Sequence, residues 1–378
     1  MRDSAIEFVD LGRQYRRLAP QIEIAITNVL RRGDYILGVE VGELESRLGE
    51  FAGVSRVITC ANGTDALQLA LMALKVGPGD VVFCPSFTFA ATAEVIALKG
   101  ATPFFVDIDI STFNVCCVSL KRSIDAARSS GLKPKAIISV DLFGLPADHD
   151  GLKVIAKAEN LFLVSDCAQS FGAKYAGRAT VSYGDIATTS FFPAKPLGCY
   201  GDGGAIFTSN ESLANELESL RVHGRGVDKY ENVRVGLNSR LDTIQAAVLL
   251  EKLKVYPEEI ELRGHVARYY NDRLHERISR PLMPRDDLSV WAQYTILLPV
   301  DADRARVQMA ISKSGVPSAV YYRCPLHLQQ AYSGCPCDPN GLGESERASQ
   351  LVLSLPMHPY LNPKELGKIV QVVNNALS

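Results

Sequence analysis

Residues 54–166 alternate short, nearly uninterrupted apolar runs with segments of helical period, and this alternation restricts the fold more than any other feature of the sequence. Strands that are buried on both faces belong to parallel sheets, in which helices form the crossover connections. The chain is therefore predicted to be an α/β protein with a mostly parallel central sheet covered by helices. Strands are expected at 56–60, 81–84, 103–106, 136–140 and 161–164, and helices at about 64–75, 90–98, 118–129 and 147–159.

The flanking segments predict further elements and a domain boundary. Two amphipathic helices are expected before the alternating region, one at 20–32 beginning at Pro20 and one ending at Gly53. Pro257 is expected to end a long helix that starts near Asn238, because proline lacks an N–H and clashes with the preceding turn. We therefore predict a large domain at 1–256 and a smaller C-terminal α+β domain at 257–378. Further strands are expected at 173–175, 186–192, 205–208, 290–300 and 319–322, and helices at 304–314 and 363–376.

Charge and composition argue against several classes of partner. The formal net charge is −2, which gives no electrostatic basis for binding nucleic acid or an anionic membrane. The N-terminus has no apolar leader and no apolar run approaches the roughly 20 residues needed to span a bilayer, so we expect a cytoplasmic protein. The nine cysteines are an odd number, as expected for reduced thiols, and Cys335-Pro336-Cys337 has no second pair beside it to complete a zinc site.

Lys195 and Asp166 are the candidate catalytic residues. Lys195 lies between Pro193 and Pro196 in an uncharged run, which predicts a rigid, poorly solvated turn, although a surface-loop lysine is the common alternative. Desolvation lowers the pKa of a lysine and makes it a nucleophile. Asp166 follows the strand at 161–164, at the sheet edge where α/β proteins bind ligands, with Gln169 close behind. Asp166 is expected either to bind a cationic ring nitrogen or to cap the next helix.

Other strand ends suggest a site for a phosphate and an aromatic ring. The turn Asn62-Gly63-Thr64 leads into a helix, where free N–H groups suit a phosphate, although an ordinary N-cap explains the same residues. Ser190 precedes Lys195 and offers a further hydroxyl, and Phe89 offers a ring for stacking unless it belongs to the core. An amine, an acid, an aromatic face and a phosphate site are what pyridoxal 5'-phosphate (PLP) requires.

The motifs that carry these residues resemble those of the sugar-nucleotide aminotransferases (DegT/DnrJ-like), a family of fold type I PLP enzymes. The similar motifs are Ala61-Asn62-Gly63-Thr64-Asp65-Ala66-Leu67, Val164-Ser165-Asp166-Cys167-Ala168-Gln169-Ser170, the run 190–204, and Gly236-Leu237-Asn238-Ser239-Arg240-Leu241-Asp242. The resemblance implies that Lys195 forms a Schiff base with PLP, that Asp166 binds its ring nitrogen, and that Gln169 lies near its hydroxyl. It also implies that Phe89 stacks on the ring, that Asn62, Gly63, Thr64 and Ser190 bind the phosphate, and that Asn238 reaches the phosphate of the neighbouring subunit of a homodimer.

The resemblance also implies a reaction, in which L-glutamate gives its amino group to a nucleotide-linked keto-sugar and leaves as 2-oxoglutarate, while the cofactor alternates between PLP and pyridoxamine phosphate (PMP). The run 235–253 and the surroundings of Lys195 are most similar to family members that act on UDP-2-acetamido-2-deoxy-3-oxo-glucuronate in the synthesis of lipopolysaccharide O-antigen sugars. Arg240 would then bind the C6 carboxylate of the sugar, or else form an ion pair at the dimer interface. His358 is expected to line the sugar pocket or to serve packing only.

Two departures from the family leave the substrate open. Asn114-Val115-Cys116-Cys117 lacks the Asp-Pro found in relatives, and the loop at 333–343 is unusual. A 4-keto-6-deoxy or 3-keto-6-deoxy sugar nucleotide is therefore an alternative acceptor, and a non-catalytic regulatory role is a second alternative, against which the intact Lys195 and Asp166 argue. The sequence argues against a nucleotide-dependent oxidoreductase, since no Gly-x-Gly-x-x-Gly turn follows the first strand.

Overall fold

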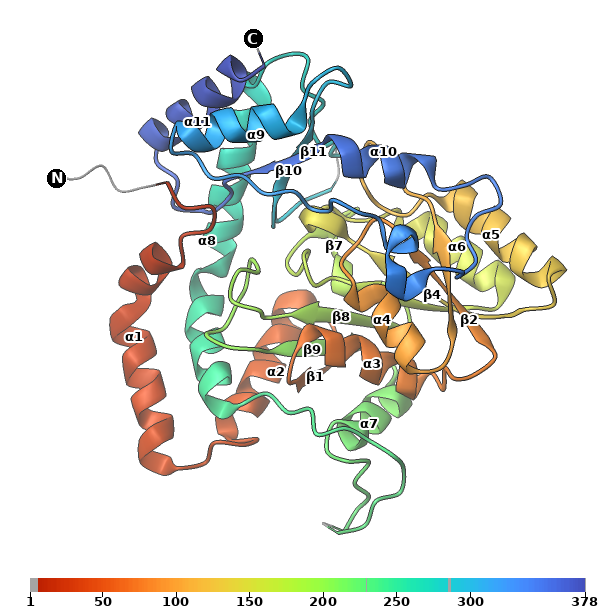
Figure 1. Cartoon of the computed structure of the whole chain (residues 1–378). Coiled ribbons are helices and arrows are strands. Elements are labelled where there is room, and N and C mark those ends of the chain that lie inside the picture. Colours follow the sequence, from red (N-terminus) through yellow and green to blue (C-terminus); the bar gives the residue numbers. More distant parts are fainter. Residues whose placement is uncertain (1–5, 229, 285–286, 378) are drawn as a thin grey trace.

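A seven-stranded sheet forms the centre of the computed structural model, which describes residues 6–228, 230–284 and 287–377 (Figure 1). Only β9 runs antiparallel to its neighbours in this sheet, and the other adjacent pairs are parallel, so the predicted mostly parallel sheet is confirmed. In spatial order the strands are β1 (Arg56–Cys60), β9 (Gly204–Thr208), β8 (Ile186–Ser190), β5 (Phe162–Asp166), β4 (Lys133–Val140), β2 (Asp80–Pro85) and β3 (Thr102–Val106).

Helices cover both faces of the sheet, because successive residues of each strand point to opposite sides. Ile58 and Val82 pack under one helical layer, which contains α3 (Gly63–Ala73), α4 (Ala91–Leu98) and α7 (Glu211–Leu220). Val57 and Val81 face the opposite layer, which contains α2 (Val39–Ala52), α5 (Cys117–Ser129), α6 (His149–Glu159) and the first half of α8 (Thr243–Arg273). The predicted helices between the strands are thus all present.

Two predictions based on proline are wrong. Helix α1 (Leu11–Arg32) begins well before Pro20, because the Asp10 side chain accepts a hydrogen bond from the Arg13 N–H and caps the helix there. Helix α8 continues through Pro257 instead of ending at it. Tyr256 and Ile260, on either side of Pro257, pack in the sheet core, and the later part of α8 packs in a second core; this burial outweighs the roughly 3 kcal/mol that an interior proline costs a helix.

A second hydrophobic core lies at the C-terminal end of α8. It is built from β10 (Tyr294–Leu297), β11 (Val352–Leu355), α9 (Arg304–Lys313) and α11 (Pro363–Asn375), and α10 (Gly343–Leu351) leads into β11. The packing of α8 changes from the sheet core to this core between Ile260 and Val266. The division into domains 1–256 and 257–378 stays a prediction. The change from the sheet core to the C-terminal core occurs within α8 and not at the end of a helix.

Two expected strands differ from the observed structure. The segment 173–175 contributes β6 (Lys174–Tyr175), which pairs with β7 (Arg178–Ala179) in a separate hairpin and does not join the central sheet. The segment 319–322 forms only an isolated bridge between Ala319 and Ser354. Both segments are too short to be distinguished from turns by their apolar pattern alone.

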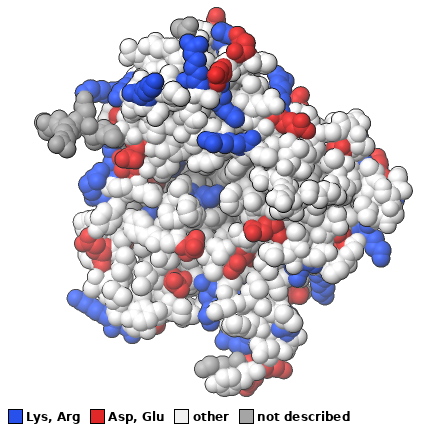
Figure 2. All heavy atoms as spheres, viewed as in Figure 1, with Lys and Arg blue, Asp and Glu red and all other residues white. Residues whose placement is uncertain are grey.

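The surface carries charges of both signs. Lys and Arg are interspersed with Asp and Glu on the face shown in Figure 2, without a broad area of one sign. Among the described residues no helix combines the length and apolar character that crossing a membrane requires. The N-terminal residues 1–5, where no apolar leader is predicted, lie outside the described residues.

Candidate active site at the carboxyl edge of the sheet

The carboxyl ends of β1, β2, β5 and β8 lie at one edge of the sheet. β1 and β8 are both antiparallel to β9, which lies between them, and therefore run in the same direction as each other. Gly204 in β9 pairs with Cys60 on one side and with Ser190 on the other. A single strand therefore separates the turn that follows β1 from the end of β8.

Glycine allows these two strand ends to approach each other. A Cβ atom on Gly63 would lie 2.6 Å from the Ser190 Cβ, and one on Gly204 would lie 2.5 Å from the carbonyl carbon of Asn62. The Asn62 side chain accepts a hydrogen bond from the Asp65 N–H at 2.8 Å and so caps α3. Within the described residues the N–H groups of Gly63 and Thr64 have no hydrogen-bond partner. The start of α3 therefore offers two free donors beside the Ser190 hydroxyl, a suitable site for a phosphate.

Asp166 is the last residue of β5, and its carboxylate is buried. It accepts a hydrogen bond from the Ala168 N–H at 3.0 Å, and no helix follows it, so the helix-capping alternative is wrong. Burial raises the pKa of Asp166 to about 6, and the Asp141 carboxylate nearby adds to this, while the Lys195 ammonium opposes it. The carboxylate is thus held in an environment that favours a proton or a cationic partner.

Lys195 lies in the loop between β8 and β9 and is partly buried. Its N–H donates to the Phe192 carbonyl at 2.8 Å, which closes the turn that the two prolines predict. Burial lowers the pKa of the Lys195 amine, and the charge of Asp166 opposes this shift. The side chain therefore differs from a freely solvated loop lysine and lies within electrostatic range of Asp166.

Gln169 is fixed by two hydrogen bonds. Its Oε1 accepts from the Phe143 N–H at 2.7 Å, and its Nε2 donates to the Tyr322 hydroxyl at 3.2 Å. Burial raises the pKa of Tyr322, and the nearby Asp166 carboxylate raises it further. Sequence reasoning missed Tyr322, because it lies far along the chain from Asp166 and follows no strand of the central sheet.

The two phenylalanines after β2 have different surroundings. Phe87 is fully buried and packs against Phe113 and Tyr322, with ring centroids 6.1 and 5.9 Å apart. Phe89 leaves 57% of its surface exposed just before α4. Phe87 therefore belongs to the core, and Phe89 remains free to contact a planar ligand at the sheet edge.

Comparisons with known proteins show the family to which this chain belongs. Residues 17–374 match the DegT/DnrJ/EryC1/StrS aminotransferase family. The chain belongs to this family. It is 46% identical over 98% of its length to the complete UDP-2-acetamido-2-deoxy-3-oxo-D-glucuronate aminotransferase of Pseudomonas aeruginosa. A DegT/DnrJ/EryC1/StrS aminotransferase from Brucella abortus has 49% sequence identity and a TM-score of 0.96, with 98% of this chain and 99% of that chain covered.

A more distant member of the fold shows the cofactor. NtdA from Bacillus subtilis, solved with bound PMP, superposes with a TM-score of 0.90 at 28% identity, and the match covers all of this chain and 86% of that one. This DegT-family chain is therefore a PLP-dependent aminotransferase. The residues at the sheet edge fit the cofactor, because they combine an amine with a lowered pKa, a buried carboxylate and the phosphate site formed by Gly63, Thr64 and Ser190.

The segment after α7 that contains Asn238 and Arg240 contacts the turn after β1 through Ser239. The Ser239 hydroxyl is buried and accepts a hydrogen bond from the Ala61 N–H at 3.1 Å. Asn238 is exposed, and Arg240 is partly buried and makes no ion pair or hydrogen bond with any other described residue. Sequence reasoning passed over Ser239, although it lies in the same motif as its two neighbours.

His358 lies in the interior and is only 2% exposed. Neither ring nitrogen has a hydrogen-bond partner among the described residues, and burial, aided by the positive charge of Arg263, lowers the pKa of His358 to about 4. The charged groups that influence it are Asp10, Arg13, Arg263 and Glu365, and none of them is a predicted cofactor residue. The packing alternative fits this position better than a place in the sugar pocket.

Proposed function

We propose that this aminotransferase transfers the amino group of L-glutamate to C3 of UDP-2-acetamido-2-deoxy-3-oxo-glucuronate, in the synthesis of lipopolysaccharide sugars. The observation that carries the choice of substrate is Arg240, a partly buried guanidinium that has no ion-pair or hydrogen-bond partner among the described residues, on the segment that contacts the turn after β1. The full-length similarity to the Pseudomonas aeruginosa enzyme of that name supports the same substrate.

The residues at the sheet edge have complementary roles in this reaction. When bound, PLP supplies a carbonyl carbon for the amino group and a ring that stabilises negative charge on the adjacent carbon. Lys195 Nζ, whose pKa is lowered by burial, moves the proton at Cα of the amino donor. The Asp166 carboxylate holds the proton on the ring nitrogen, and the N–H groups of Gly63 and Thr64 hold the phosphate. Gln169, fixed by Phe143 and Tyr322, orients the hydroxyl side of the ring.

A homodimer is part of this proposal. Asn238 is exposed, so its side chain is available to the phosphate of a second copy. The preceding arm, whose described residues are 223–228 and 230–236, projects from the body of the protein below α7 (Figure 1). Val227, Val233 and Val235 on this arm are exposed apolar side chains, which supports burial against another subunit.

The visible spectrum of the purified protein tests the reaction type. Protein saturated with PLP is expected to show the yellow absorption of lysine-bound cofactor, to lose it when L-glutamate is added, and to regain it when the UDP-keto-sugar follows. 2-Oxoglutarate released in the first step is measured by a coupled dehydrogenase. Absence of the yellow band even with excess PLP would contradict the proposed site and favour a regulatory role.

Arg240→Gln tests the substrate. A guanidinium that binds a carboxylate through two hydrogen bonds contributes about 1.5–3 kcal/mol, so kcat/KM for the 3-oxo-glucuronate substrate is expected to fall by roughly 10- to 100-fold. The matched control is the same sugar nucleotide with a hydroxymethyl group in place of the C6 carboxylate, and kcat/KM for this compound is expected to change less than about threefold. An equal loss for both substrates would assign Arg240 to the dimer interface instead.

A further inference from the structure

A second lysine with unusual surroundings, Lys252, lies on α8. It is 1% exposed, which is rare for a lysine, and its ammonium group forms no ion pair with any described carboxylate. Its Nζ instead donates a hydrogen bond to the Gly198 carbonyl at 2.7 Å and lies 4.1 Å from the centroid of the Tyr200 ring. A buried cation carries a large desolvation penalty, so a lysine that is held only by a carbonyl and an aromatic face calls for a functional explanation.

Both partners of Lys252 belong to the loop that carries Lys195. Gly198 lies against the residues that precede Lys195, since a Cβ atom there would lie 2.5 Å from the Pro193 oxygen and 2.6 Å from the Phe192 oxygen. The Cys199 N–H donates to the Phe191 carbonyl at 2.8 Å and ties the two sides of the loop together. A displacement of Gly198 would therefore move the turn that positions Lys195.

A second side chain of α8 holds the same loop. Gln245 Oε1 accepts a hydrogen bond from the Tyr200 N–H at 2.8 Å. Gln245 and Lys252 are seven residues apart, which places them two turns apart on one face of the helix. Because α8 continues into the second core, it connects the Lys195 loop rigidly to the C-terminal part of the chain.

We propose that Lys252 is a positioning residue for the aminotransferase reaction, which holds the Lys195 loop in its active conformation through the Gly198 carbonyl and the Tyr200 ring. This inference rests on the role of Lys195 in the proposed function. Lys252 does not touch the cofactor site itself. It acts on the conformation of the loop and so on the orientation of the Lys195 amine.

The charge of Lys252 is expected to change in the mildly alkaline pH range. Burial lowers the pKa of Lys252 to about 8, and Glu259 and the Cys199 thiol oppose this shift. The pKa of Tyr200 is raised to about 12 by burial, with smaller contributions from Tyr15 and Glu259, so its ring stays neutral. Lys252 is therefore charged below about pH 8, and the attraction to the Tyr200 ring is lost above it.

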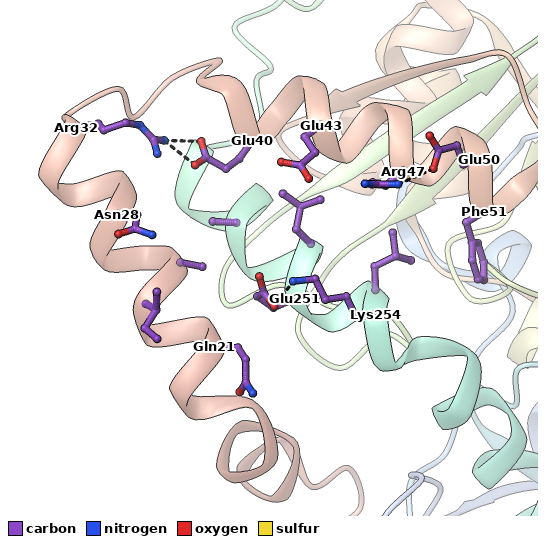
Figure 3. A pocket seen from close by; sticks show the side chains of 15 residues that line it. Gln21, Asn28, Arg32, Glu40, Glu43, Arg47, Glu50, Phe51, Glu251 and Lys254 are labelled. Atoms are coloured by element: carbon purple, nitrogen blue, oxygen red, sulfur yellow. Dashed lines mark hydrogen bonds and ion pairs between the residues drawn. The ribbon is translucent and has the colours of Figure 1, made fainter.

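Lys252→Met in the PLP-loaded protein tests the proposal, with Lys254→Met as the matched control. Lys254 lies two residues away but points into a groove of about 890 Å³ between α1, α2 and α8, where it pairs with Glu251 (Figure 3). Lys252→Met is expected to lower kcat by about 10- to 100-fold with little change in KM for L-glutamate, because displacement of the Lys195 amine slows the reaction. The visible circular dichroism of the bound cofactor is expected to be weaker in Lys252→Met than in the unmodified protein. In the unmodified protein this signal is expected to fall above pH 8, because Lys252 loses its charge there, and Lys252→Met should show no such fall.

The outcomes separate this inference from the proposed function. If the unmodified protein is active and Lys252→Met matches Lys254→Met in kcat, dichroism and pH profile, the inference is wrong and the proposed function stands. If the unmodified protein itself binds no PLP, the proposed function fails first. If Lys252→Met does not fold, Tyr200→Leu replaces it as the test, because this change removes only the aromatic partner. Tyr200→Leu is expected to lower kcat and the dichroism to a smaller degree. If it lowers neither, the inference is wrong.

Discussion

Lys195→Ala is expected to lower turnover by about 10³-fold or more while PLP still binds. In the proposed function the Lys195 amine is the proton carrier at the sheet edge, and removal of such a group costs roughly 10²- to 10⁴-fold. The proposed phosphate site at Gly63 and Ser190 and the carboxylate of Asp166 are expected to stay intact in the variant, because among the described residues Lys195 makes no side-chain hydrogen bond or ion pair that holds them. Single-turnover release of 2-oxoglutarate from L-glutamate measures the loss.

The covalent link to the cofactor gives an independent readout of the same variant. After reduction with borohydride, mass spectrometry should find PLP attached to Lys195 in the unmodified protein and no attached PLP in Lys195→Ala. A small amine added to the solution is expected to restore part of the turnover, since it replaces the missing base. Turnover of Lys195→Ala within tenfold of the unmodified protein, or PLP attached to another lysine, would refute the assignment.

The central sheet and one side of the site follow from local sequence patterns. Apolar runs without polar alternation indicate strands buried on both faces, and parallel strands place their carboxyl ends at one edge. Asp166, two residues beyond the predicted strand at 161–164, is placed at that edge in this way, whereas Ser190 lies inside the predicted strand at 186–192, and only the structure shows it as the last residue of β8. The position of Gly204 between β1 and β8, which decides how closely the strand ends approach, depends on pairing between distant segments.

The residues that sequence reasoning missed are those positioned by packing between distant segments. Tyr322 reaches Gln169 from the C-terminal part of the chain, and Ser239 reaches Ala61 across the start of α3. Lys252 lies inside a helical pattern in which a lysine is ordinarily solvated, and nothing in the local sequence indicates that it faces a loop carbonyl. The wrong break at Pro257 has the same origin, because burial of both halves of α8 overrides a local signal.

Asp166→Asn is expected to reduce activity and to stabilise the protein at the same time. In the proposed function the Asp166 carboxylate supplies the negative charge that keeps the ring nitrogen protonated, and an amide cannot, so kcat should fall by about 10²-fold or more. In the PLP-free protein the same carboxylate is destabilising, because burial raises its pKa to about 6 from the ordinary 3.8. Such a shift corresponds to about 3 kcal/mol of unfolding free energy, which the neutral amide recovers.

The pH dependence of this gain gives the decisive measurement. Above pH 6 Asp166 is charged in both the folded and the unfolded protein, so the full gain from Asp166→Asn is expected there. At pH 4 the side chain is protonated in the folded state and partly protonated in the unfolded state, so only a small part of the gain should remain. Urea unfolding of the PLP-free protein at pH 7.5 and pH 4 measures it, with the exposed Asp125→Asn as a control that should show no gain at either pH. An unchanged unfolding free energy at pH 7.5 would mean that Asp166 has a compensating partner in the PLP-free protein, and the buried, proton-binding role assigned to it would then be wrong.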